Sequence, residues 1–201
     1  MKTYQVKVRG VTPLIMHNSA GVDSQNKYTI EMKPLKAKRA KTDADDKKLR
    51  DLSFLQSLYW NDDLGLYMPA ENVQKMLLEA GRHLDQKGAK KSVVGITFSE
   101  YLGFPIETKN SRDLEKLAND EALRYTKIVQ VQKAKIVAVR AIFKEWRFQF
   151  ELEIDETILN PATCLEWVEY AGKRVGLGSR RPYAPTPGSF GKFIVEDFKE
   201  V

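Results

Sequence analysis

Residues 172–193, with the sequence GKRVGLGSRRPYAPTPGSFGKF, combine glycine, arginine and aromatic side chains in one short stretch. Gly176 and Gly178 permit positive φ angles and close backbone approach, so N–H groups there can face an anion. Arg180 and Arg181 add charged planar donors that suit phosphate oxygens. This pattern predicts a phosphate-binding loop. The alternative interpretation is a glycine- and proline-rich surface loop without a ligand.

The loop follows neither of the two familiar phosphate-binding motifs. No Lys-Ser or Lys-Thr pair follows its glycines at the spacing of a P-loop. The dinucleotide-binding motif connects a strand to a helix, whereas residues 172–193 are expected to connect a helix to a strand. No nucleotide cofactor is therefore predicted, and no other cofactor is expected.

Basic residues are concentrated in two stretches that contain no acid. The chain has 33 Lys and Arg residues against 27 Asp and Glu, a net charge of +6. Residues 122–144 and 170–195 hold basic residues but no Asp or Glu. Such segregation favours a polyanionic partner such as nucleic acid. The phosphate contacts predicted in these stretches, besides Arg180 and Arg181, are Lys133, Lys135, Arg140 and Arg174.

A third basic run, residues 33–41, lies within a polar segment, 17–41, that we expect to be irregular. Lys38 and Arg39 are the residues of this run predicted to contact nucleic acid. The alternative is a solvated, mobile loop, which is the usual state of a run of like charges. Tyr4 and Tyr125 are candidates for base stacking, with burial in the protein as the alternative.

Few residues are candidates for catalysis. The chain has two histidines and one cysteine, too few for a cysteine-based zinc cluster. His17 and Asp23 are the residues considered for catalysis, but a strand end and a turn explain them better. The aspartate pairs at 45–46 and 62–63 are interpreted as cap and turn residues rather than metal ligands. The default interpretation is a protein that is not an enzyme and holds no metal.

The composition is that of a globular chain. Apolar residues make up 42% and charged residues 30%. No run approaches 18 apolar residues, which argues against a membrane span, and the N-terminal stretch lacks the apolar core of a signal peptide. We therefore expect a cytoplasmic protein with no membrane contact.

Hydrophobic periodicity predicts strands and helices along most of the chain. Alternation predicts strands at 3–9, 146–155 and 190–198, and a longer strand at 128–143 with a bend near 132–133. The strands at 128–143 and 146–155 are expected to form an antiparallel hairpin. Helical spacing and cap residues predict helices at 43–59 and 70–87, and a third that begins at Asn160-Pro161. Residues 92–98 look extended, and residues 110–123 look weakly helical.

The order of these elements is strand, helix, strand, strand, helix, strand. It predicts a ferredoxin-like α+β fold, in which an antiparallel sheet carries helices on one face. RNA-recognition domains bind bases on the opposite, open face. We interpret residues 1–201 as one domain. Residues 17–60 form an inserted basic loop and helix, and residues 89–126 form an insertion or long connection.

The glycine-rich loop resembles that of the RAMP superfamily, the repeat-associated mysterious proteins. The match is G-x-G-x-x-R followed by G-x-F, at Gly176, Gly178, Arg181, Gly191 and Phe193, between the last helix and the last strand. Residues 66–73, LYMPAENV, resemble the entry to the first conserved helix of that family, and a small residue followed by Arg, as at 81–82, often continues it. The three glycines are expected to shape the loop.

The resemblance implies a single-stranded nucleic-acid binder, with RNA as the usual ligand. Members include backbone subunits of CRISPR effector complexes in antiviral defence, which stack side by side along a guide, and relatives encoded by phages. The resemblance thus implies a homo-oligomer or a larger ribonucleoprotein, with a loop that protrudes and kinks the strand, assigned by position to 17–41. Two alternatives remain: a RAMP-type endoribonuclease, and a phage accessory protein that binds a host or CRISPR protein.

Overall fold

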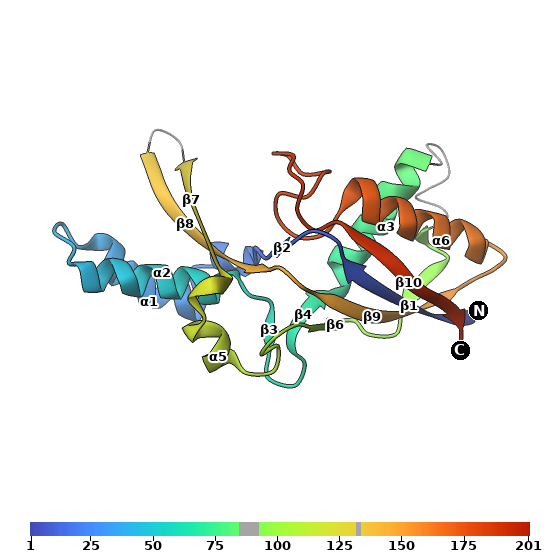
Figure 1. The fold of residues 1–201 in the computed structure, drawn as a ribbon, viewed down its shortest axis with the longest axis horizontal. Coiled ribbons are helices and arrows are strands. Elements are labelled where there is room, and N and C mark those ends of the chain that lie inside the picture. The colour runs from blue at the N-terminus through green and yellow to red at the C-terminus, as the bar shows by residue number, and fades with distance from the viewer. Residues whose placement is uncertain (85–92, 132–133) are drawn as a thin grey trace.

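The computed structural model describes residues 1–84, 93–131 and 134–201. Its main sheet is antiparallel throughout, and its hydrogen-bonded order is β10-β1-β9-β6-β4-β3, with β5 also paired to β9 (Figure 1). The strands of this sheet are β1 (Lys2–Gly10), β3 (Trp60–Asn61), β4 (Gly65–Pro69), β5 (Ile96–Phe98), β6 (Gly103–Glu107), β9 (Arg147–Ile154) and β10 (Phe193–Glu200).

The ferredoxin-like fold is confirmed by the positions of four strands and two helices. The fold requires its last strand beside its first, and its first beside its third, and β10, β1 and β9 lie in that order. Helices α3 (Ala70–Leu84) and α6 (Pro161–Tyr170) pack against each other over the sheet. Period-two alternation places Val6 and Phe150 in the core beneath them.

The second strand of this motif lies where the sequence analysis expected an insertion or long connection. Residues 89–126 contain β5 and β6, and both pair with β9. These strands are only three and five residues long, too short for alternation to distinguish them from a loop. The weakly helical part is α5 (Leu114–Asn119), followed by a 3₁₀ turn, η2 (Glu121–Leu123).

The long strand expected at 128–143 is wrong, because the structure has two antiparallel strands there. They are β7 (Arg124–Val131) and β8 (Ala134–Phe143), which pair from Arg124–Ala141 to Val131–Ala134. The apolar residues change from one side of the alternation to the other between the two strands because the chain reverses there, and not because one strand bends. The expected hairpin with 146–155 is also wrong: β8 pairs with β7 and with β2 (Leu14–Ile15) in a separate sheet, while β9 belongs to the main sheet.

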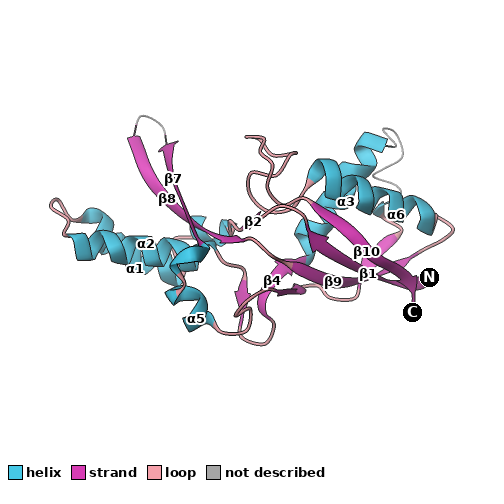
Figure 2. Cartoon of the chain, in the orientation of Figure 1, coloured by secondary structure: helices cyan, strands magenta, loops and turns pink. Residues whose placement is uncertain are grey.

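The segment 17–41, expected to be irregular, is largely helical. A 3₁₀ turn, η1 (Ser19–Val22), precedes helix α1 (Lys27–Ala37). Asn26 caps the N-terminus of this helix. Hydrophobic periodicity does not predict this helix, because it contains Pro34 and buries only one residue, Met32. Helix α2 (Asp43–Ser57) forms as predicted, with Thr42 as its cap. Both helices lie beside the β7–β8 hairpin, away from the main sheet (Figure 2).

Arg124 anchors this helical layer to the hairpin. Its side chain is only 9% exposed, donates to the Asp51 carboxylate at 2.6 Å, and lies 4.7 Å from the centre of the Phe54 ring. Ser57 adds a buried link, because its hydroxyl accepts from the backbone N–H of Ala141 at 2.9 Å. Arg124 is therefore a structural residue, although it lies in one of the acid-free basic stretches.

The capping box of α2 makes a testable contribution to acid stability. Asp45 accepts from Lys38 at 2.6 Å and from the Thr42 N–H at 3.0 Å, and these bonds lower its pKa to about 2. Because the folded pKa lies below the unfolded value of about 4, the stabilisation is complete above that pH and disappears as the pH falls through about 2. Asp45→Asn should therefore lower the Tm at pH 7, with a difference that shrinks below pH 4.

Thermal unfolding of both proteins between pH 2 and 7, followed by circular dichroism, measures this difference. Asp46→Asn, an exposed neighbour in the same helical turn, is the matched control. A Tm difference between wild type and Asp45→Asn that stays constant down to pH 2 would contradict the assignment.

The open face of the main sheet is polar and carries both charges. Its central strands present Gln5, Lys7 and Arg9 of β1 beside Arg147, Gln149 and Glu151 of β9. Gln5 donates to Glu151 at 3.2 Å, and Arg9 donates to Glu196 of β10 at 2.6 Å. These two central strands place no aromatic ring on that face. It therefore differs from the base-binding face of an RNA-recognition domain.

Within the described residues, none of the helices combines the length and the apolar character that crossing a lipid bilayer requires.

Candidate nucleic-acid interface

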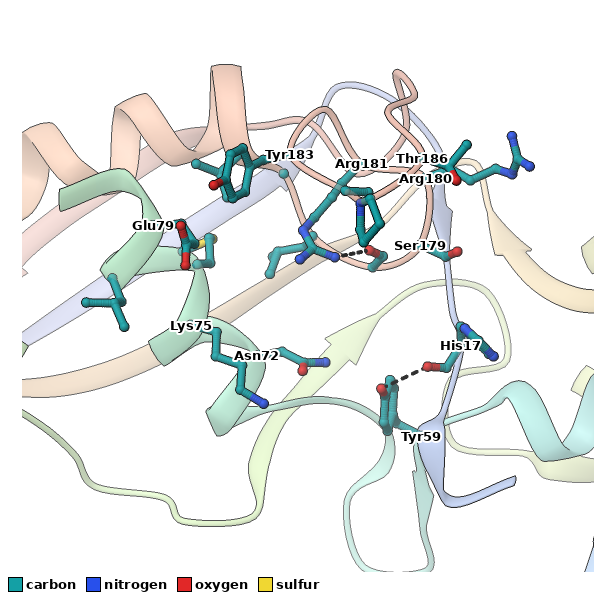
Figure 3. A pocket seen from close by; sticks show the side chains of 18 of the residues that line it. His17, Tyr59, Asn72, Lys75, Glu79, Ser179, Arg180, Arg181, Tyr183 and Thr186 are labelled. Carbon is teal, nitrogen blue, oxygen red and sulfur yellow. Dashed lines mark hydrogen bonds between the residues drawn. The ribbon is translucent and has the colours of Figure 1, made fainter. Parts of the chain in front are cut away.

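A groove of about 1010 Å³ lies between α3, the glycine-rich loop and β8. The loop supplies one wall, the exposed side of α3 supplies the opposite wall, and His17 and Tyr59 lie at one end (Figure 3). Three of the predicted phosphate contacts, Arg140, Arg180 and Arg181, line this groove. The tertiary structure thus brings together residues that are about forty positions apart in the chain.

Glycine conformations determine the course of the loop. Helix α6 continues into a π-helical turn, η3 (Ala171–Val175), and Gly176 follows with φ 73°. Gly178 and Gly191 also have positive φ, 71° and 68°. A Cβ on Gly178 would lie 2.4 Å from the Ile15 carbonyl oxygen, and one on Gly191 would lie 1.8 Å from that of Leu177. These positions require glycine for two reasons, backbone conformation and space.

Several backbone N–H groups of the loop donate within the protein, and that of Gly176 donates to the Ala171 carbonyl at 2.8 Å. Leu177 donates to the Gly191 carbonyl at 3.0 Å, Ser179 to that of Ile15 at 2.8 Å, and Gly191 to that of Pro13 at 2.8 Å. The bond from Leu177 lies within the loop, and those from Ser179 and Gly191 fasten it to β2 and to the segment between β1 and β2. These N–H groups are therefore occupied, and the arginine side chains remain the predicted anion contacts of the loop.

The three arginines occupy different positions around the loop. The Arg140 guanidinium donates to the Ser179 hydroxyl at 2.6 Å, and that of Arg181 donates to the Gly178 carbonyl at 3.0 Å. Figure 3 shows Arg181 directed toward the α3 side and Arg180 directed away from it. Arg180 has φ 55°, a conformation that glycine would adopt with less strain.

The charge of the groove is strongly positive. Its lining contains five basic residues and one acid, Glu79. Burial, and then repulsion from Arg180, lowers the pKa of the Arg140 guanidinium. In the part of the chain that the structure describes, Arg140, Arg180 and Arg181 form no ion pair with a carboxylate. A bound anion would relieve this repulsion.

Lys75 and Arg82 of α3 are groove residues that the sequence analysis missed. They are seven residues apart, so they lie on one face of the helix. Lys75 is paired with Glu71 at 3.0 Å and Arg82 with Glu79, both on the exposed side of α3. The seven-residue spacing was readable in the sequence. Which face of α3 meets the loop was not.

The remaining predicted contacts lie elsewhere. Arg174 is exposed on η3 but is not part of the groove lining. Lys38 pairs with Asp45, and the α1–α2 connection that holds Lys38 and Arg39 lies at the end of the molecule far from the glycine-rich loop (Figure 1). Lys133 lies outside the described residues. Lys135 belongs to β8 near the far end of the hairpin, and its side chain is also outside the described part.

The two candidate catalytic residues are separated. His17 lines the groove, accepts from the Tyr59 hydroxyl through its carbonyl at 3.0 Å, and has a pKa lowered by burial and by Arg140. Asp23 ends η1 and accepts from the Gln25 N–H at 2.9 Å, as a turn residue does. Among the described side chains, His, Cys, Asp and Glu form no group of three or more that could hold a metal ion.

The aromatic residues considered for base stacking have partners inside the protein. Tyr4 is buried and stacks on Phe198 at 5.2 Å between ring centres. Tyr125 of β7 lies opposite Arg140 of β8 and packs edge-to-face on Phe190 of the loop at 5.7 Å. Tyr4 therefore belongs to the core, while Tyr125 and Phe190 join the hairpin to the loop beside Arg140.

Comparison with known proteins shows the class of fold. No protein-family model and no curated protein matches the chain. Among solved structures, a chain of the Type III-B Cmr-beta complex bound to cognate target RNA matches over 100% of this chain, with a TM-score of 0.51 and 12% identity. The protein therefore shares its fold with a chain of that RNA-bound complex. It spans 61% of that chain's length.

Proposed function

We propose that this protein is a RAMP-type protein that binds single-stranded nucleic acid, RNA in preference to DNA, through the groove between α3 and the glycine-rich loop. The observation that carries the proposal is the convergence of Arg140, Arg180 and Arg181 in one groove whose lining holds a single acid. The fold similarity to a chain of an RNA-bound complex supports RNA as the ligand.

Binding in such a groove is mainly electrostatic. Arginine side chains would contact phosphate oxygens, release counterions and bind with little preference for sequence. The polar, mixed-charge sheet face supports the groove, rather than that face, as the binding surface. The role we propose is non-catalytic: the groove holds the strand and leaves its bonds intact.

We further propose that the protein acts within a larger assembly along the strand. Two segments project from the main sheet, the α1–α2 pair and the β7–β8 hairpin (Figure 1). Either could reach a neighbouring subunit, and the RNA-bound complex that shares the fold supports such an assembly. Size-exclusion chromatography with and without a long single strand tests this proposal.

Fluorescence anisotropy with labelled single-stranded RNA, single-stranded DNA and duplex RNA tests the binding proposal. We expect the affinity for single strands to exceed that for duplex and to fall steeply as salt is raised from 50 to 200 mM. Absence of binding at low salt would refute the proposal. It would favour the third interpretation, a protein that recognises a host or CRISPR protein.

Cleavage of RNA is the second candidate function, because His17 lines the same groove. Burial and Arg140 lower its pKa, which favours the neutral imidazole, the form that can accept a proton. Incubation of end-labelled RNA with the wild type and with His17→Ala distinguishes the two functions. Cleavage that His17→Ala abolishes would establish a nuclease, whereas intact RNA in both samples agrees with a binder.

A further inference from the structure

An exposed aromatic cluster lies at the edge of the groove. Tyr183 lines the groove and is 46% exposed, an unusual state for an aromatic side chain in a loop that is otherwise fastened to the protein. Its ring packs edge-to-face on His83 at 5.0 Å, and His83 lies 5.9 Å from Tyr170 of α6. An edge-to-face contact leaves at least one face of the Tyr183 ring uncovered by His83.

The backbone holds Tyr183 in place. Its N–H donates to the Val175 carbonyl at 3.2 Å, which ties it to the end of η3. Pro182 and Pro185 flank it and restrict the loop backbone. Because the Tyr183 ring is exposed but already held in one position, it loses little conformational entropy when a ligand stacks on it.

Cationic side chains line the same groove as this ring. Arg181 is two residues away in the loop, and Arg82 of α3 precedes His83; both line the groove. Figure 3 shows Tyr183 above Glu79 of α3, beside the space toward which Arg181 is directed. A flat apolar face beside guanidinium groups matches a nucleotide, which joins a flat base to a charged phosphate.

We propose that Tyr183, supported by His83, is a stacking platform for one nucleobase of the bound strand. The proposal rests on the proposed function and adds a non-electrostatic contact to it. Base stacking on aromatic side chains tolerates all four bases. The platform therefore contributes affinity without sequence preference, and its contribution does not depend on salt.

The test compares the wild type, Tyr183→Ala, Tyr183→Phe and Tyr101→Ala in anisotropy titrations with a labelled single strand. Tyr101 is 93% exposed and is not part of the groove lining, so it controls for loss of a surface tyrosine. We expect Tyr183→Ala to weaken binding by about 5- to 100-fold at unchanged salt slope. Tyr183→Phe and Tyr101→Ala should bind as the wild type does.

A strand of the same length with abasic sites completes the test. On this strand, Tyr183→Ala and wild type should bind equally, because there is no base to stack. Two results would overturn the platform and leave the groove in place. In one, Tyr183→Ala binds the normal strand as tightly as the wild type does; in the other, it loses as much affinity on the abasic strand as on the normal strand. Absence of binding by the wild type would overturn the proposed function itself, and the platform with it.

Discussion

The double variant Arg180→Ala/Arg181→Ala is expected to bind single-stranded RNA about 10- to 100-fold more weakly at low salt, whatever the sequence of the strand. Both side chains line the groove, and neither pairs with a carboxylate among the described residues. Loss of two phosphate contacts should also flatten the slope of log affinity against log salt by about 1.4 for a single strand. Anisotropy titrations at several salt concentrations measure both quantities.

A control of equal charge separates this effect from a general loss of positive potential. Lys7→Ala/Lys199→Ala removes two exposed lysines on the open side of the sheet. In the β1–β10 register, Lys7 lies opposite Asp197 and Lys199 lies opposite Gln5. It should change the affinity far less. If both double variants lose affinity equally, the loop is not the binding site and the open sheet face must be reconsidered.

Arg180→Gly is a second variant, which tests whether a loss of RNA affinity could result from misfolding. Arg180 has φ 55°, so glycine should relieve backbone strain while it removes the guanidinium. We expect the Tm to stay the same or rise and the RNA affinity to fall. Damage to the fold would lower both the Tm and the affinity, so a loss of affinity without a loss of Tm would point to the guanidinium itself.

Gly191→Ala is expected to disrupt the loop and with it the groove. Gly191 has φ 68°, and an added Cβ would lie 1.8 Å from the Leu177 carbonyl oxygen, a backbone atom that cannot rotate away. Its N–H and carbonyl also tie the loop to Pro13 and Leu177. We expect the free energy of unfolding to fall by about 2–4 kcal/mol and RNA binding to be lost.

Chemical denaturation and RNA titration of the same preparation check this expectation. Gly21→Ala is the matched control, since the atoms nearest to its Cβ would belong to the flexible Gln56 side chain rather than to the backbone. That variant should change stability by less than about 1 kcal/mol. A Gly191→Ala protein with wild-type stability and affinity would show that the loop conformation is not required.

Much of the fold was predictable because its signals are local. Strands β1, β9 and β10 alternate polar and apolar residues, and the caps of α2 and α6 are Thr42 and Asn160. The reversal between β7 and β8 was misread because the two intervening residues are Gln and Lys, not the Asn or Gly typical of a hairpin turn. Helix α1 was missed because Pro34 interrupts its pattern.

By itself, the sequence determined the first, third and last strands and the two helices of the ferredoxin-like motif, together with the glycine-rich loop and the segregation of charge. These properties depend on neighbouring residues, which fold according to local periodicity and backbone freedom. Only the tertiary structure decided that β8 leaves β9 for a second sheet and carries Arg140 to the loop. The meeting of Arg140, Lys75 and Arg181 depends on contacts between distant segments, and no local pattern encodes which faces pack together.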